Sequence, residues 1–143
     1  MRSTCSEIMT RDPVVVSASD IVQKAAELMK QYDIGPLPVV DAETSRKLIG
    51  IITDRDIVIN VLAQKKDPSK TKVSEVMSPD PVTCRESESI NEALEKMSSY
   101  QIRRIPVVDD NTRIVGIIAQ ADIATRIENP EIAGEVVQEV SKE

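Results

Sequence analysis

The residues best suited to chemistry lie where an apolar run leads into a polar, helix-like segment. Thr53 and Asp56 stand three residues apart, directly after Leu48–Ile52. The first turn of a helix offers unpaired backbone N–H groups and a partial positive charge, which suit a phosphate. A threonine hydroxyl adds a donor, and a carboxylate three residues on can accept hydrogen bonds from a ribose diol. The same spacing is close to a capping box, in which both side chains only satisfy backbone donors.

A second copy of this turn occurs later in the chain. Gly50–Asp56 reads Gly-Ile-Ile-Thr-Asp-Arg-Asp, and Gly116–Asp122 reads Gly-Ile-Ile-Ala-Gln-Ala-Asp. The aspartate is present in both copies, whereas Ala119 stands where the first copy has its threonine. The two turns are therefore related, but they are not equally equipped to hold a ligand.

A pair of arginines is the second candidate for ligand binding. Arg103–Arg104 falls where the first copy has Gly35–Pro36. The planar guanidinium group pairs bidentately with phosphate. Two other interpretations stay open: the arginines balance nearby carboxylates such as Asp109 and Asp110, or they face solvent.

These pairs belong to an internal repeat that covers most of the chain. Between Ser6–Asp41 and Ser74–Asp109, 16 of 36 aligned positions are identical. The offset is 68 residues there and 66 from Gly50 onward, so a loop is two residues shorter in the second copy. Because of this repeat, we expect an architecture of two similar structural units, and the strands and helices are predicted within that frame.

Each repeat is predicted to have the order β-α-β-β-α, which makes an α/β (α+β) fold. In the first repeat the expected strands are 14–16, 37–40 and 48–52, with Ser19 as the N-cap of one helix and Thr53 or Asp54 as the start of the other. In the second repeat the expected strands are 82–84, 105–108 and 114–118, and the expected helices are 87–100 and 120–126. The repeats are predicted to span residues 6–66 and 67–127. An amphipathic helix is expected over 128–143, either covering its own core or packing on a second subunit.

Composition excludes several classes of function. The chain has 143 residues, a formal charge of −6 and no histidine, Phe or Trp. The acidic balance argues against nonspecific nucleic-acid binding. Without histidine, a Cys/His zinc site and a histidine-based triad are ruled out. No apolar run approaches the length of a membrane span and no signal peptide is recognisable, so we expect a cytoplasmic protein with no membrane partner.

The repeated segments resemble the tandem cystathionine-β-synthase (CBS) domain family. The resemblance rests on Met-x-x-x-Pro-Val at Met9 and Met77, on the strands Leu37–Asp41 and Ile105–Asp109, and on the doubled Gly-h-h-x-x-x-Asp turn. It covers about residues 6–127 and is similar to the stand-alone bacterial pair of the hypoxic-response type. The resemblance implies two repeats related by a pseudo-two-fold axis in one compact module, clefts at their interface, and a homodimer of modules.

The resemblance also implies ligands and the residues that bind them. The clefts of the family commonly hold adenosine-containing ligands, such as AMP, ADP, ATP or S-adenosylmethionine, to regulate a partner protein. One predicted cleft combines Asp122, Ala119, Gln120 and Arg104 with Ser17, Ile34 and Gly35. The other combines Asp56, Thr53, Asp54 and Arg55 with Arg85, Ile102 and Arg103. The isoleucines are expected to line the adenine slot, and the aspartates to bind ribose.

Neither predicted cleft has every favourable group. The Asp122 cleft lacks the hydroxyl at Ala119 but has Arg104. The Asp56 cleft has Thr53 but places Asp54 near any phosphate. If a nucleotide binds, we therefore expect the Asp122 cleft to fill first.

Four further kinds of residue receive mainly structural interpretations. Cys84 is interpreted as a small buried hydrophobe, with a redox switch as the alternative, and Cys5 is placed near a mobile terminus. The methionines at 9, 29, 77 and 97 are predicted to fill the core. Tyr32 and Tyr100 are interpreted as packing residues, with stacking on a base as the alternative.

The sequence thus predicts a regulatory module that senses an adenosine-containing ligand and signals to an unknown partner protein. No cofactor is required by this prediction. The alternative is a ligand-free dimerisation or stress-response protein with degenerate clefts. An enzyme is not expected, because no nucleophile with a paired base, metal-ligand cluster or glycine-rich phosphate loop is present.

Overall fold

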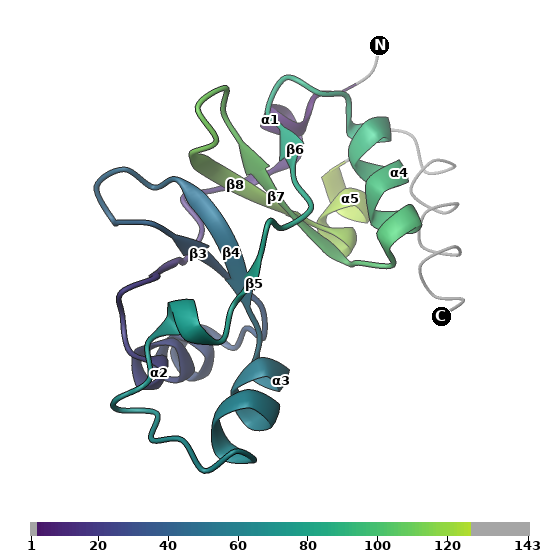
Figure 1. Ribbon diagram of the computed structural model, residues 1–143. Coiled ribbons are helices and arrows are strands. Elements are labelled where there is room, and N and C mark those ends of the chain that lie inside the picture. The colour runs from purple at the N-terminus through teal and green to yellow at the C-terminus, as the bar shows by residue number, and fades with distance from the viewer. Residues whose placement is uncertain (1–2, 127–143) are drawn as a thin grey trace. The chain divides into compact units, whose positions relative to one another are not determined.

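The computed structural model describes residues 3–126, and the predicted helix over 128–143 lies outside them. The N-terminal segment contains α1 (Cys5–Ile8) and β1 (Thr10–Arg11). The first repeat continues with β2 (Val16–Ser17), α2 (Val22–Tyr32), β3 (Leu37–Val40), β4 (Leu48–Ile52), α3 (Asp54–Ile57) and a π-helical turn η1 (Val58–Leu62). The second contains η2 (Val73–Glu75), β5 (Ser78–Pro79), β6 (Cys84–Arg85), α4 (Ile90–Tyr100), β7 (Arg104–Val108), β8 (Ile114–Ala119) and α5 (Gln120–Arg126) (Figure 1).

The described chain forms two compact units, each with its own four-stranded sheet. Unit A, as we name it, contains residues 3–13 and 82–126, and its strand order is β1-β8-β7-β6. Unit B is Val14–Pro81, with the order β2-β3-β4-β5. In both sheets one neighbouring pair is parallel and the other pairs are antiparallel. The predicted mixed α+β class is confirmed.

The two repeats exchange their entry segments. β1 comes from the start of the first repeat but pairs with β8 of the second, and β5 comes from the start of the second but pairs with β4 of the first. The compact units therefore begin and end at different residues from the sequence repeats.

Two glycines make room for this exchange. A Cβ atom on Gly50 would lie 2.7 Å from Met77 Sδ and 2.9 Å from the Ser78 carbonyl oxygen. A Cβ on Gly116 would lie 2.7 Å from Met9 Cγ. Real Cβ atoms essentially never come so close to other atoms, so each entry methionine needs a glycine on the strand beneath it.

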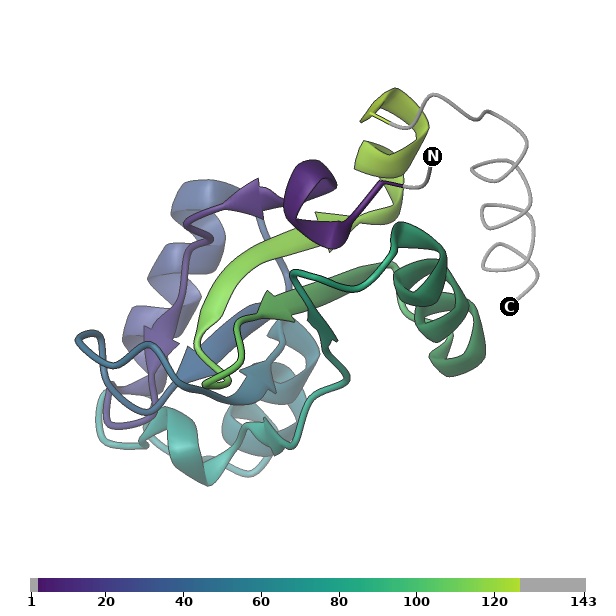
Figure 2. The same ribbon diagram turned by 90° about the horizontal axis from the view of Figure 1, so that it is seen from above.

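Each unit has an aliphatic core, as the composition predicts. In unit B the core lies between the sheet and the apolar face of α2, where Val22 and Ala25 are fully buried. In unit A, α4 covers the sheet in the same way, and α1 packs against both α4 and α5 (Figures 1 and 2). Met9, Met29 and Met97 are buried and Met77 is half-buried, in agreement with their predicted role in the core.

The helix boundaries differ from the prediction at several points. α2 begins after Ile21, with no side-chain cap, so Ser19 is not its N-cap. α4 begins after Ser89, whose side chain accepts from the Glu92 N–H. Both helices end on a residue in the left-handed region, Asp33 (φ 53°) and Gln101 (φ 54°). A left-handed residue is a common helix stop, so α2 ends at Tyr32, ahead of Gly35–Pro36, and α4 ends at Tyr100, as predicted.

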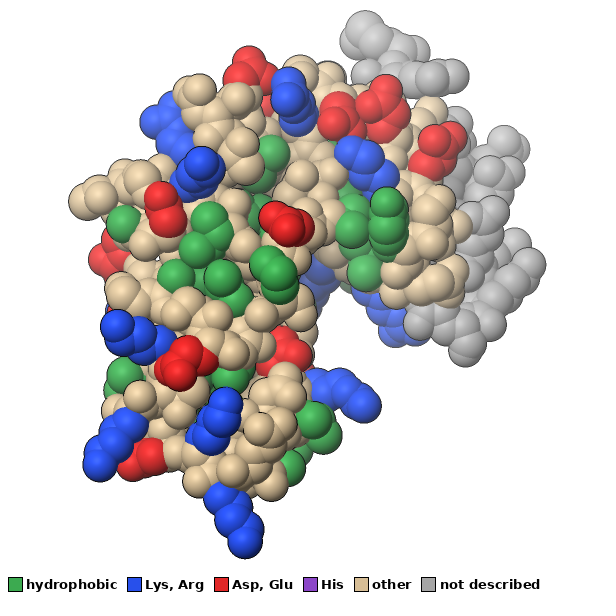
Figure 3. Space-filling model, viewed as in Figure 1, with side chains coloured by type: hydrophobic (Ala, Val, Ile, Leu, Met, Phe, Trp, Pro, Cys, Tyr) green, Lys and Arg blue, Asp and Glu red, His purple; other side chains and the backbone are tan. Residues whose placement is uncertain are grey.

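The helix after β4 is only half buried. The sequence predicts that Ile57, Val58, Val61 and Leu62 share one apolar face. Ile57 and Val61 do face the core, but Val58 and Leu62 are 52% and 56% exposed. The change from α to π geometry at Val58 alters the residue spacing on which that prediction depended. Figure 3 shows apolar side chains at the surface close to where α3 lies in Figure 1.

Candidate functional site

In unit B, the candidate residues gather at one end of the β3–β4 hairpin. Leu37 at the start of β3 pairs with Ile52 at the end of β4. The turn before β3 therefore lies beside the turn that opens α3. A Cβ on Gly35 would lie 3.2 Å from Asp54 Oδ1, so these two residues are immediate neighbours. The prediction placed Gly35 and Asp54 in different clefts, whereas the structure brings them together within one unit.

The Thr53–Asp56 turn forms a complete capping box. The Asp56 N–H donates to Thr53 Oγ1 at 3.1 Å, and the Thr53 N–H donates to Asp56 Oδ2 at 2.9 Å. Among residues 3–126, no hydrogen bond to the second carboxylate oxygen of Asp56, Oδ1, is found. The structural interpretation of this motif is thus confirmed, and half of the carboxylate keeps its capacity to accept further hydrogen bonds.

Unit A places the equivalent residues in the same relation. Arg104 at the start of β7 pairs with Ala119 at the end of β8, and the Gln120 N–H donates to the Arg103 carbonyl at 2.8 Å. Asp122 is half-buried in the first turn of α5. The two arginine residues and an aspartate turn therefore lie at the same end of the sheet.

The charges of Arg103 and Arg104 are not balanced by the carboxylates that the sequence suggested. Arg113 Nε lies 3.0 Å from Asp109 Oδ2, and Arg85 Nη1 lies 3.5 Å from Asp110 Oδ1. Burial pushes the pKa of Asp109 upward, but hydrogen bonds from backbone N–H groups and the Arg113 side chain outweigh it, so this pKa is lower than usual. Arg103 and Arg104 are exposed, and within the described part of the chain they form no ion pair.

Two predicted site residues lie at the opposite ends of their sheets. β2 runs parallel to β3 and pairs Ser17 with Val40, and β6 pairs Arg85 with Val108. Each partner ends a strand whose start carries the candidate turn. β3 alone has four residues, which is roughly 13 Å at about 3.3 Å per residue. Ser17 is also buried, and its N–H donates to Asp20 Oδ2 at 2.9 Å. Neither residue joins the candidate turn of its own unit.

The predicted adenine-lining residues are already partly packed. Ile34 and Ile102 are half-buried against the cores of their own units. Tyr32 and Tyr100 are 49% and 62% exposed, so the interpretation of these rings as packing residues is wrong. Arg55 is exposed in the first turn of α3. The grouping of residues from both repeats into two shared clefts stays a prediction.

The proximity of Gly35 and Asp54 was not predicted from the sequence. The two predicted strands contain the information needed to find this proximity. If they form a hairpin in which Val40 pairs with Leu48, the residues before Leu37 must lie beside the residues after Ile52. The pairing register of the hairpin shifts between Val39 and Val40, but the hairpin still brings these two turns together.

No group of three or more His, Cys, Asp or Glu side chains within residues 3–126 could hold a metal ion. Over the same residues, no helix has both the length and the apolar character needed to cross a membrane.

Comparison with known proteins agrees with this architecture. The CBS domain family model matches residues 5–63 and 73–129. The CBS domain-containing protein YhcV of Bacillus subtilis is 40% identical over 139 residues, which cover 97% of this chain and 96% of YhcV. The crystal structure of Hypoxic Response Protein I with two coordinated zinc ions has a TM-score of 0.77 and 36% identity, over 87% of this chain and 99% of that one.

Two similar structures contain adenosine compounds. CBSX2 in complex with AMP has a TM-score of 0.72 and 27% identity, over 86% of this chain and 94% of that one. The CBS domain pair of MJ0100, in complex with 5′-methylthioadenosine and S-adenosyl-L-methionine, has a TM-score of 0.72 and 34% identity, over 87% and 95%. With a family model that matches both repeats and relatives of nearly its own length, the chain belongs to the CBS domain family as a tandem pair.

Proposed function

We propose that this protein is a regulatory module that binds an adenosine-containing ligand and passes the signal to a partner protein. The observation that carries the proposal is the pair of aspartate turns, one in each unit, at the start of α3 and of α5. Similar CBS pairs hold AMP, methylthioadenosine or S-adenosylmethionine, which all contain the ribose that a carboxylate recognises. The proposed role does not include catalysis.

The Asp56 carboxylate can cap α3 with one oxygen and bind a ribose hydroxyl with the other. Oδ2 accepts from the Thr53 N–H, and a ribose hydroxyl would donate to Oδ1. A hydrogen bond to a charged group contributes about 1.5–3 kcal/mol, which is enough for binding to depend on this side chain. The cap holds the carboxylate in one orientation before the ligand arrives, so less conformational entropy is lost on binding.

Arg103 and Arg104 give unit A its preference for an anion. Both residues lack an ionic partner within the described part of the chain, and the backbone of both lies next to the end of β8. In unit B the residue beside the corresponding turn is Asp54, which would repel a phosphate. The missing hydroxyl at Ala119 costs only about 0.5–1.5 kcal/mol, less than a charge-assisted contact contributes. We therefore propose that AMP occupies the Asp122 side first.

Calorimetry with AMP tests the proposal directly. Asp122→Ala should weaken the first binding event about tenfold, equivalent to 1.4 kcal/mol, whereas Asp56→Ala should weaken it less. Glu95→Gln, which removes an exposed carboxylate on α4, serves as the control for Asp122→Ala. Equal affinity of wild type and Asp122→Ala, or a larger loss from Asp56→Ala, would overturn the ranking. No binding of any adenosine compound would refute the proposed function itself.

A second candidate function is a ligand-free dimerisation platform. Val58, Ile59 and Leu62 form an exposed apolar surface on one helix, with exposed fractions of 52%, 47% and 56%. Such a surface favours contact with another chain. Light scattering should then give twice the chain mass of 15.8 kDa, and Leu62→Glu should shift the mass toward the monomer. A dimer that shows no thermal shift with AMP, methylthioadenosine or S-adenosylmethionine would favour this second function.

A further inference from the structure

The two cysteines of the chain, 79 positions apart in sequence, meet in the core of unit A. Cys5 and Cys84 are 0% and 1% exposed, and both belong to the same buried cluster. They lie on adjoining backbone segments, which hydrogen bonds hold together. Both are free thiols. The expectation that Cys5 lies near a mobile terminus is wrong, because α1 holds it in the core.

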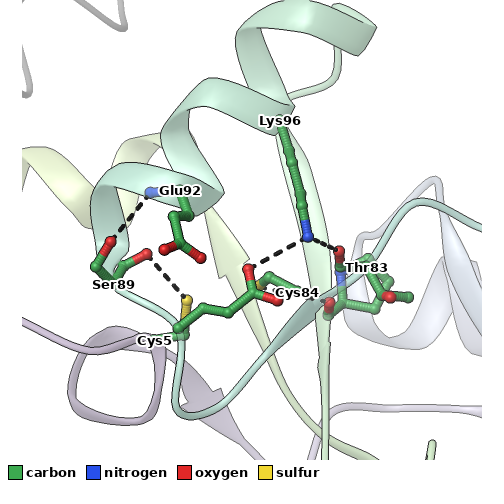
Figure 4. Close-up of polar contacts among 8 residues, drawn as sticks. Cys5, Thr83, Cys84, Ser89, Glu92 and Lys96 are labelled. Atoms are coloured by element: carbon green, nitrogen blue, oxygen red, sulfur yellow. Dashed lines mark hydrogen bonds and ion pairs between the residues drawn. The ribbon is translucent and has the colours of Figure 1, made fainter.

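The backbone around Cys5 is fixed to the chain that follows Cys84. The Cys5 N–H donates to the Glu88 carbonyl at 2.9 Å, and the Ile90 N–H donates to the Ser3 carbonyl at 2.8 Å. The Cys5 thiol lies 3.8 Å from the Ser89 carbonyl oxygen. Cys84 belongs to β6, two residues before Glu86, whose carbonyl accepts from the Ser6 N–H at 3.0 Å. Figure 4 shows both cysteines beside the first turns of α4.

The surroundings make the two thiols unequal. The hydrogen bond from Cys84 lowers the pKa of Cys5 despite burial, which opposes it. The same hydrogen bond and burial raise the pKa of Cys84. The Lys96 ammonium favours the thiolate form, while Glu88 disfavours it and pairs with Lys96 at 3.2 Å. Cys5 is thus the thiol that ionises first, and Cys84 keeps its proton.

We propose that Cys5 and Cys84 form a reversible intramolecular disulfide when a small two-electron oxidant such as hydrogen peroxide reaches them. The Cys5 thiolate attacks one peroxide oxygen, the O–O bond breaks, and the hydroxide takes up a proton and leaves as water. Cys5 is then a sulfenic acid. Cys84 Sγ loses its proton and attacks Cys5 Sγ, and the S–O bond breaks to release a second water. The two thiols lose two electrons and two protons, and the peroxide is reduced.

The disulfide would close a covalent loop of the chain that contains the whole of unit B. Every residue of Val14–Pro81 lies between the two cysteines in sequence, and the bond would fix residues 3–13, including β1, to the rest of unit A. Long closed loops lose the most entropy in the unfolded state, so oxidation should raise Tm by roughly 5–15 °C. Complete burial of both sulfurs means that the N-terminal segment must first open. The oxidation rate should therefore level off as peroxide concentration rises.

Peptide mapping of the full chain tests the proposal. The reduced protein is treated with dilute peroxide in the presence of EDTA, and remaining thiols are blocked with iodoacetamide before digestion with trypsin. The expected product is the peptide of residues 3–11 joined to that of residues 73–85, with the loss of two hydrogen atoms. Dithiothreitol should reverse both the cross-link and the increase in Tm.

Cys5→Ala and Cys84→Ala serve as matched controls, since each keeps a small apolar side chain in the core. Neither should gain stability on oxidation, and Cys84→Ala should stop at the sulfenic acid, which dimedone traps. The wild-type peptide map needs no variant, so it decides the matter even if a variant fails to fold. Disulfide-linked dimers, sulfinic acid without a cross-link, or two thiols that remain alkylatable would each overturn the proposal.

Discussion

The capping box of Thr53 and Asp56 offers the sharpest test of how this fold is stabilised. Thr53→Ala removes the acceptor of a 3.1 Å hydrogen bond from the Asp56 N–H. Loss of a threonine cap costs about 1 kcal/mol, which for a chain of this size lowers Tm by roughly 2–4 °C. Asp56→Ala removes the reciprocal 2.9 Å bond from the Thr53 N–H and should cost a similar amount.

The two substitutions should not be additive, because each side chain orients the other. In a double-mutant cycle measured by urea denaturation, the pair should cost less than the sum of the single changes by about 0.5 kcal/mol or more. Thr44→Ala is the matched control, since Thr44 is exposed in a loop. Unit A supplies the reverse experiment: Ala119→Thr should add the missing cap before Asp122 and raise Tm.

A loss from Thr53→Ala no larger than that from Thr44→Ala would refute this reasoning. Strict additivity of the Thr53 and Asp56 substitutions would refute it as well. The first result would mean that the hydroxyl contributes nothing to the folded protein without a ligand, so its role would have to be sought in binding alone. The second would mean that the two hydrogen bonds of the capping box form independently of each other.

Two further predictions follow from the fold. Gly50→Ala and Gly116→Ala should each destabilise the protein by about 1–3 kcal/mol in urea denaturation, because the added Cβ would overlap Met77 or Met9, whereas Gly35→Ala, with its nearest neighbour at 3.2 Å, should cost less. Equal losses at all three glycines would contradict this account of the entry segments. The second prediction concerns acid: the Ser45 hydroxyl, opposed by burial and helped by the Ala42 N–H, holds the pKa of Asp41 below its ordinary value. The hydrogen bonds to Asp41 stabilise the fold above the ordinary carboxyl pKa, and this stabilisation is lost as pH falls through the lowered pKa. The Asp41→Asn variant should therefore lose less stability than the wild type between neutral pH and about pH 3. Parallel pH profiles of the two proteins would refute this prediction.

Local pattern was enough to predict the strands that carry the candidate turns. Leu37–Val40 and Leu48–Ile52 begin and end as predicted, because short β-branched runs bounded by turn residues leave few alternatives. The start of α5 at Gln120 was predicted equally well. The first residues of the helices were harder to predict, because a serine near an apolar stripe can either cap the helix or lie in the turn before it, as Ser19 does.

The exchange of entry segments could not be predicted from local pattern. β1 and β5 have two residues each, and β5 includes Pro79, so neither shows a strand pattern. Their partners are distant in sequence: Thr10 pairs with Ile117, and Ser78 with Ile51. The meeting of Cys5 with Cys84 follows from the same exchange, because α1 enters unit A only together with β1.

Some of the differences between the two repeats fall where a ligand would bind. Pro-Val-Val is identical in β3 and β7, and the glycine and aspartate of each turn are present in both copies. At the sheet end, however, Gly35–Pro36 is replaced by Arg103–Arg104, and Thr53 by Ala119. Substitutions there leave the core untouched but change charge and hydrogen bonding at the candidate turns. We infer that the two turns select different ligands: unit A favours an anionic group through its arginines, whereas unit B, with Asp54 beside Gly35, favours an uncharged adenosine compound over a phosphorylated one.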